Sequence, residues 1–203
     1  AVRVLGGEED YSFLTKAETA NMLIMAGELV LMGVVIFYSI RYKKIYAMLL
    51  SIAGTLPIVW LDLSGRMPEG EAHFHIDNLT VIMCLVVGIV GSLICIYAVG
   101  YIKDYHQHHR DYPERSNWFL AMLFVFLGAM FGLLFCDNMG WMYFFWEITS
   151  VCSFLLIGYN KQPESIQNSF KALWMNLLGG CGFAVAILYS ALQLHVTNLS
   201  QLL

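Results

Sequence analysis

One long apolar stretch decides the fold of this chain, Gly140-Trp-Met-Tyr-Phe-Phe-Trp146-Glu147-Ile-Thr-Ser-Val-Cys-Ser-Phe-Leu-Leu-Ile157-Gly-Tyr159. It is long enough for a transmembrane helix, which needs roughly 20 predominantly apolar residues. Glu147 is the one charged residue in it. An ionised side chain near the centre of such a helix costs on the order of 3 kcal/mol, so carboxylates at such positions usually serve ion movement. Glu147 is therefore predicted to lie on an ion pathway.

The composition places the chain among membrane proteins. Of its 203 residues, 59% are hydrophobic and 13% are charged, whereas a soluble domain carries roughly 25% charged residues. The net charge of −4 comes without a basic run, which argues against nucleic-acid binding. The five cysteines lack Cys-x-x-Cys spacing, so they indicate buried apolar side chains rather than disulfides or an iron–sulfur site.

Six apolar runs are each long enough to cross the membrane as helices, at about 22–40, 45–61, 78–102, 117–136, 139–158 and 168–193. The predicted fold class is therefore an all-α, polytopic transmembrane helical bundle. Basic residues concentrate in the connections 41–44, 103–116 and 159–167. By the positive-inside rule these loops lie inside and the N-terminus lies outside.

Glu147 has polar neighbours on its own helix face. Tyr143 lies one turn before it and Ser150 one turn after it. A phenol and a hydroxyl at these positions suit a group that exchanges a proton with water. The plainer alternative is a carboxylic acid that stays neutral and serves helix packing.

Lys171, in the sixth span, is the second candidate. It is either an interfacial lysine whose amine reaches the inner headgroups, or a buried cation that serves Glu147. Counting along the helices places Lys171 near the inner surface and Glu147 in the outer half. We therefore expect two separate stations rather than a tight pair, with Asn176 as a polar neighbour.

Other acidic residues and the histidines have plainer explanations. Glu28 in the first span is either functional or interfacial, and Asp77 is predicted to cap the third span. The histidines of the inside and outside loops cannot meet across the membrane, and none lies in the core of a span, so we expect no metal site and no bis-histidine haem. They are His106, His108 and His109 inside, and His73 and His75 outside.

A family resemblance emerges from these motifs. The run Trp146-Glu147-Ile-Thr-Ser-Val-Cys-Ser-Phe-Leu-Leu-Ile-Gly-Tyr159 resembles the fifth-helix signature of the antiporter-like subunits of respiratory complex I, closest to the large distal subunit. It is also similar to the large A-type component of Mrp sodium/proton antiporters and to membrane-bound hydrogenase homologues. Phe170-Lys171-Ala-Leu, followed by Asn176 and Gly179, resembles the lysine segment of the sixth helix.

The resemblance covers about residues 74–203, which it marks as the start of an antiporter-like ion-translocating domain. Residues 1–73 form a polar lead and two generic spans. The resemblance implies that Glu147 is the channel glutamate and Lys171 the sixth-helix lysine. Family members continue into two inverted repeats with a central lysine on the seventh helix, so this chain is expected to be an N-terminal part. Gly179-Gly180 replaces the Gly-Asp common in complex I and is closer to Mrp and the hydrogenases.

The predicted function is that of a proton- or sodium-translocating subunit in a complex I-type redox-driven pump, such as NADH-quinone oxidoreductase or a related hydrogenase. No cofactor is expected in this chain, whereas flavin and iron–sulfur clusters are expected in partner subunits. The expected partners are other membrane subunits, protons or sodium ions, and lipid. The expected location is an energy-coupling membrane: a bacterial or archaeal cell membrane, or an organelle inner membrane. The alternatives are a redox-independent Mrp-type antiporter and a structural subunit with a degenerate channel.

Overall fold

The computed structural model describes residues 11–13, 18–67, 74–108 and 115–202 of the chain. Within these residues, six helices are long and apolar enough to cross a membrane, which confirms the predicted all-α polytopic bundle. They are α1 (Glu18–Arg41), α2 (Ile45–Leu63), α3 (Asn78–His108), α4 (Ser116–Phe135), α5 (Met139–Ile157) and α6 (Pro163–Tyr189).

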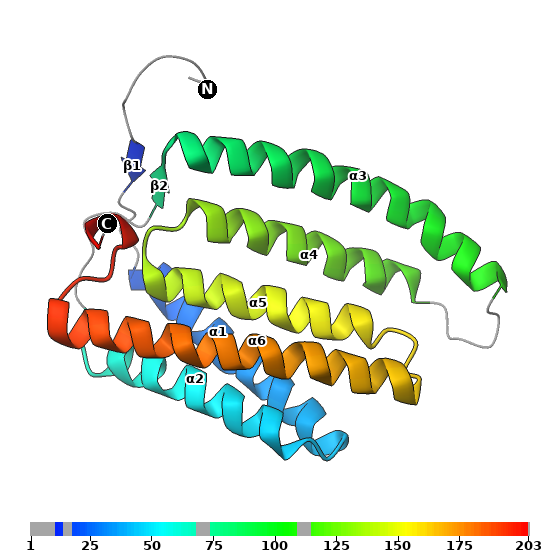
Figure 1. Cartoon of the computed structure of the whole chain (residues 1–203), viewed down its shortest axis with the longest axis horizontal. Helices are drawn as coiled ribbons and strands as arrows, with labels where there is room; N and C mark the ends of the chain where they lie inside the picture. Colours follow the sequence, from blue (N-terminus) through cyan, green and yellow to red (C-terminus); the bar gives the residue numbers. More distant parts are fainter. Residues whose placement is uncertain (1–10, 14–17, 68–73, 109–114, 203) are drawn as a thin grey trace.

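The helices pack in the spatial order α3, α4, α5, α6, α2, with α1 against both α2 and α5 (Figure 1). A short antiparallel ladder of β1 (Tyr11–Phe13) and β2 (Phe74–Ile76), which the apolar pattern did not predict, lies at one end of the bundle. Because α1, α2, α5 and α6 contact one another, they enclose the only region of the described chain with buried charged side chains on several helices.

Polar side chains fix where the helices begin. The side chain of Asp77 accepts hydrogen bonds from the amide and hydroxyl of Thr80, both at 2.6 Å, so the predicted cap of α3 is confirmed. Oδ1 of Asn138 accepts from the amides of Gly140 and Trp141 at the start of α5. Each cap satisfies backbone N–H groups that have no partner inside their helix.

The loop between α4 and α5 holds the segment that follows α6. Both carboxylate oxygens of Asp137 accept hydrogen bonds from Ser200, one from its amide at 2.9 Å and one from its hydroxyl at 2.6 Å. The amide of Met139 donates to the carbonyl of Thr197 at 2.9 Å. The end of α6 is thereby tied to the beginning of α5, which fixes how these two helices lie side by side.

Two helix boundaries differ from the prediction. The third span was expected to end near residue 102, with His106 and His108 in a loop, and this was wrong because α3 continues to His108. A row of tyrosine rings leads into this extension: Tyr97 and Tyr101 are stacked with centroids 5.9 Å apart, and Tyr101 and Tyr105 are tilted with centroids 6.2 Å apart. The hydropathy pattern locates where the chain leaves the apolar layer, whereas the helix itself continues beyond it.

The second of these boundaries is the start of α6, which lies at Pro163 rather than near residue 168. The first residues of α6, 163–167, are mostly polar, so the apolar pattern does not include them. Proline fits the first turn of a helix because its missing N–H would have no partner there. Lys171 consequently lies about two turns inside α6 rather than one.

Two buried apolar clusters lie on either side of Glu147. Tyr143, on the turn before it, belongs to a cluster formed by α2, α5 and α6. Val151 and Phe154, on the turns after it, belong to a cluster to which α1 also contributes. Glu147 is therefore held between two packed layers rather than at a helix end.

Replacement of Asp77 by alanine is predicted to loosen the first turn of α3. Loss of such a cap costs about 1 kcal/mol, which corresponds to roughly fivefold faster amide exchange. The Thr80 side-chain and backbone hydrogen bonds hold the pKa of Asp77 below its usual range. The cap is therefore fully present above the ordinary carboxyl pKa and is lost only as the pH falls through the lowered value. Hydrogen–deuterium exchange of the Thr80 and Val81 amides checks this, and equal rates in both proteins would contradict it.

Candidate functional site

Glu147 is buried in the middle of α5, with 6% of its surface exposed. One carboxylate oxygen, Oε1, accepts hydrogen bonds from the hydroxyl of Thr55 at 3.0 Å and from the phenol of Tyr143 at 2.9 Å. Thr55 comes from α2 and Tyr143 from the preceding turn of α5. Two donors on one oxygen stabilise the ionised form of a carboxyl group in an apolar layer.

Gly54 makes room for this arrangement. A Cβ atom at this position would lie 2.6 Å from the hydroxyl oxygen of Tyr143. Any larger residue would therefore push the phenol away or separate α2 from α5. Because Gly54 has no side chain, the Tyr143 phenol fits against α2 at the level where Thr55 donates to Glu147.

The second carboxylate oxygen, Oε2, is buried and has no hydrogen-bond partner within the described parts of the chain. The same holds for the indole nitrogen of the adjacent Trp146. Both residues line a small cavity between α1, α2, α5 and α6. It leaves about 10 Å³ for the centre of a water molecule, which is close to the least that one water needs. Its polar lining consists of Ser51, Tyr143, Trp146, Glu147, Ser150 and Asn176.

The structure brings most of the predicted site residues to this cavity. Tyr143 bonds directly to Glu147, while Ser150 and Asn176 line the cavity without such a bond. The hydroxyl of Ser150 donates instead to the carbonyl of Trp146 at 3.0 Å. Hydroxyls on helices often satisfy themselves in this way, one turn back. Ser150 therefore contributes polarity to the wall rather than a direct contact.

Lys171 is not beside Glu147. It is exposed, whereas its neighbours Phe170 and Leu173 are fully buried toward α5 and α2. Beyond Lys171, toward the end of α6, this face is apolar and open, with Met175 61% exposed and Leu178 55% exposed. The two residues thus occupy different faces of the bundle, and their role as separate stations stays a prediction.

Glu28 is more deeply placed than an interfacial residue. It lies near the middle of α1 with 3% of its surface exposed, which the sequence left open. It interacts electrostatically with Glu147 and with Asp62, which is half-buried at the end of α2. Three acidic groups from three helices therefore lie in one region.

Sequence reasoning missed Thr55 and Trp146 as parts of the site. Ser51 and Thr55 are spaced four residues apart in α2 and are both buried on the face toward α5 and α6. Such a polar pair within an apolar span was the available signal. The sequence places Trp146 next to Glu147, but nothing in it indicates that the indole nitrogen is buried without a partner.

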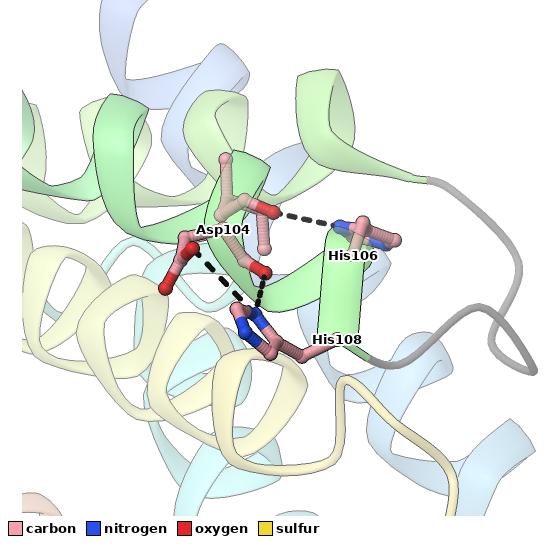
Figure 2. Close-up of polar contacts among 4 residues, drawn as sticks. Asp104, His106 and His108 are labelled. Carbon is pink, nitrogen blue, oxygen red and sulfur yellow. Dashed lines mark hydrogen bonds and ion pairs between the residues drawn. The ribbon is translucent and has the colours of Figure 1, made fainter.

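The Nδ1 atoms of His106 and His108 face backbone carbonyls of their own helix (Figure 2), and Nε2 of His106 lies 3.3 Å from the phenol of Tyr159. Nδ1 of His106 lies 2.8 Å from the carbonyl of Ile102, and Nδ1 of His108 lies 3.0 Å from the carbonyl of Asp104. His73 and His109 lie outside the described residues. Among the residues described, no three His, Cys, Asp or Glu side chains are placed to hold a metal ion.

Comparison with known proteins matches two segments of the chain. Residues 60–112 match the N-terminal family of NADH-ubiquinone oxidoreductase (complex I) chain 5. Residues 136–203 match the transmembrane family of NADH:quinone oxidoreductase and Mrp antiporters. These segments belong to the antiporter-like subunit family. The matches confirm the resemblance to complex I and Mrp subunits, and Glu147 and Lys171 lie within the second segment.

Individual relatives come from both branches of this family. The A1 component of the Na(+)/H(+) antiporter of Staphylococcus haemolyticus is 32% identical over 146 residues, which are 67% of this chain and 17% of the relative. The L component of the NADH-quinone oxidoreductase of Rhodobacter capsulatus is 40% identical over 117 residues, which are 56% of this chain and 16% of the relative. The chain thus spans about a sixth of the length of these curated relatives.

Replacement of Gly54 by alanine is predicted to displace the Tyr143 phenol and lengthen its 2.9 Å bond to Glu147 beyond hydrogen-bonding distance. The reason is the 2.6 Å approach that the added methyl group would make. Cryo-electron microscopy of the protein in lipid nanodiscs measures this distance. Gly33→Ala is the matched control, because nothing in the described chain lies within 4 Å of a Cβ there. An unmoved phenol in Gly54→Ala would show that the close approach is not required.

Proposed function

We propose that this chain forms the N-terminal part of an ion-translocating membrane subunit, in which Glu147 takes up and releases the transported proton. The observation that carries the proposal is the environment of one carboxylate. Glu147 is buried in the middle of a spanning helix, is held by two donors on one oxygen, and has its other oxygen free beside a cavity of one-water size.

This geometry separates two tasks between the two oxygens of Glu147. Oε1 is fixed by Thr55 and Tyr143, which orient the group and stabilise its negative charge. Oε2 remains available to receive a proton from a water in the cavity. The hydroxyl of Ser51 and the amide of Asn176 lie in the wall of the same cavity and would orient that water.

Lys171 is proposed as the second station on the path. An exposed lysine two turns inside a spanning helix, next to exposed apolar side chains, is unusual on a surface that faces lipid. The chain spans about a sixth of its curated relatives, so we propose that later helices of a full-length subunit cover this face. Movement of the lysine charge toward or away from Glu147 would then favour release or uptake of the proton.

The domain division is proposed on the same basis. Residues 74–203 form the start of the ion-translocating domain, and residues 1–73 form the polar lead and two supporting spans. The second of these spans, α2, supports the ion-translocating domain directly, because it supplies Thr55 and Gly54 to the Glu147 site.

The wider assembly is proposed to be a complex I-type redox-driven pump in an energy-coupling membrane. The 40% identity with an L component of NADH-quinone oxidoreductase supports this reading. Flavin and iron–sulfur clusters would then reside in partner subunits. The alternative, a redox-independent Mrp-type antiporter, is supported by the longer match to the A1 component and by Gly179-Gly180.

The composition of the purified complex distinguishes these two assemblies. If the redox-driven reading is right, mild detergent extraction through a tag on this chain is expected to recover flavin- and iron-containing proteins. Absorbance, iron analysis and mass spectrometry of the purified material measure this. Recovery of small membrane proteins alone, without flavin or iron, would favour the Mrp-type antiporter.

Replacement of Glu147 by glutamine is predicted to reduce proton translocation at least tenfold in proteoliposomes of the intact complex. Glutamine keeps an oxygen that accepts from Tyr143 and Thr55 but cannot bind and release a proton. Glu164→Gln is the matched control, because Glu164 is exposed in the first turn of α6. Unchanged pumping by an assembled Glu147→Gln complex would make Glu147 a packing residue.

A further inference from the structure

We propose that Glu28 on α1 is a second proton-holding group, which carries the proton while Glu147 carries the negative charge and links Glu147 to the outer face of the membrane. The inference rests on the proposed function of Glu147 and extends it to a helix that neither family match includes. The matched segments are residues 60–112 and 136–203, whereas α1 ends at Arg41.

The packing of α1 places Glu28 beside the Glu147 site. α1 approaches α5 closely at Gly27, where a Cβ atom would lie 2.6 Å from the ring of Phe144. One turn beyond Glu28, Leu31 and Met32 line the same cavity as Glu147. Glu28 itself is almost fully buried, so its carboxyl group lies among these helices rather than in lipid or at the surface.

The charged and titratable groups that face Glu28 are all acidic or neutral. α5 presents Glu147 and the phenol of Tyr143, and α2 presents Asp62. The exposed Lys171 lies on another face of α6. Two carboxylates in one apolar region, without a cation between them in the described chain, cannot both remain ionised at an acceptable cost.

The hydrogen bonds decide which of the two groups holds the charge. Oε1 of Glu147 accepts from two neutral donors, Thr55 and Tyr143, and this favours its ionised form. Glu28 is then the group that keeps its proton. The proton passes between them through water, because Oε2 of Glu147 has no hydrogen-bond partner in the described chain. The O–H bond of Glu28 breaks as a water accepts its proton, water gives a proton to Oε2 of Glu147, where an O–H bond forms, and the negative charge moves to Glu28.

Asp62 continues the path toward the outer face. It is the penultimate residue of α2, and on the predicted orientation that end of α2 lies outside. It is half-buried and interacts electrostatically with Glu28. Asp62, Glu28 and Glu147 therefore form a descending series of carboxyl groups from the outer surface to the centre of α5. A proton released by Glu28 has Asp62 as its next acceptor.

Proton translocation by variants of the intact complex in proteoliposomes tests the inference. Glu28→Gln is expected to lower pumping at least tenfold, whereas Glu28→Asp, which keeps a titratable group, is expected to retain at least half. The double variant with Glu147→Gln is expected to pump no less than Glu147→Gln alone, because groups that act as one unit do not add. Glu164→Gln again serves as the control.

The outcomes separate this inference from the proposed function. Normal pumping by Glu28→Gln, with pumping lost in Glu147→Gln, would overturn the role of Glu28 and leave that of Glu147 intact. Equal loss in Glu28→Gln and Glu28→Asp would also overturn it. Such a result would show that pumping depends on the size of the Glu28 side chain and not on its ability to hold a proton. Normal pumping by Glu147→Gln would instead overturn the proposed function.

A measurement on the unaltered complex guards against effects of the substitutions on assembly. Dicyclohexylcarbodiimide modifies carboxyl groups that are protonated in apolar surroundings, and peptide mass spectrometry locates the modified residue. We expect modification at Glu28 in excess of that at Glu147. Modification of Glu147 but not of Glu28 would show that Glu147, rather than Glu28, holds the proton, and would overturn the inference.

Discussion

The structure depends on how the buried carboxylate of Glu147 is satisfied. An ionised group at this depth costs on the order of 3 kcal/mol, and a hydrogen bond to a charged group contributes about 1.5–3 kcal/mol. The two bonds from Thr55 and Tyr143 are therefore of the size needed to keep the group inside the bundle. They also explain why α2 must lie against α5 at one defined level, where Gly54 admits the phenol.

The rest of the bundle preserves that level. Asn138 fixes the start of α5, and Asp137 binds the segment after α6, so these two helices keep a common register. Apolar clusters pack on either side of Glu147, so the polar groups near it are confined to its own level of the bundle. The cavity that remains is small, and an isolated water there would meet the free oxygen of Glu147 and the indole N–H of Trp146. A rigidly packed bundle in which only this water can rearrange suits controlled proton exchange with Glu147.

Much of this arrangement was accessible from sequence because the bilayer imposes simple rules. The apolar runs predicted six spans, which the structure has. The isolated charge predicted that Glu147 lies on an ion pathway, and that role stays a prediction. The i, i+4 spacing predicted Tyr143 as its neighbour, and the hydrogen bond at 2.9 Å follows it. The predictions of the spans and of Tyr143 succeed because each concerns one helix at a time.

The predictions that failed or stayed open concern contacts between helices and helix ends in water. Nothing local to α2 says that Thr55 meets α5, since that contact is set by how the helices pack. The burial of Glu28 against α5 was left open for the same reason. The polar extension of α3 to His108 carries no apolar signal, so the apolar pattern predicts a loop where the helix continues.

The most direct test of the central claim is infrared difference spectroscopy of the intact complex in membranes, compared between its resting and energised states. If Glu147 exchanges the transported proton, the wild type shows a change in the carboxyl C=O stretch that Glu147→Gln lacks and Glu164→Gln retains. The same carboxyl signal in the wild type and in Glu147→Gln would show that Glu147 does not change protonation and would contradict the account.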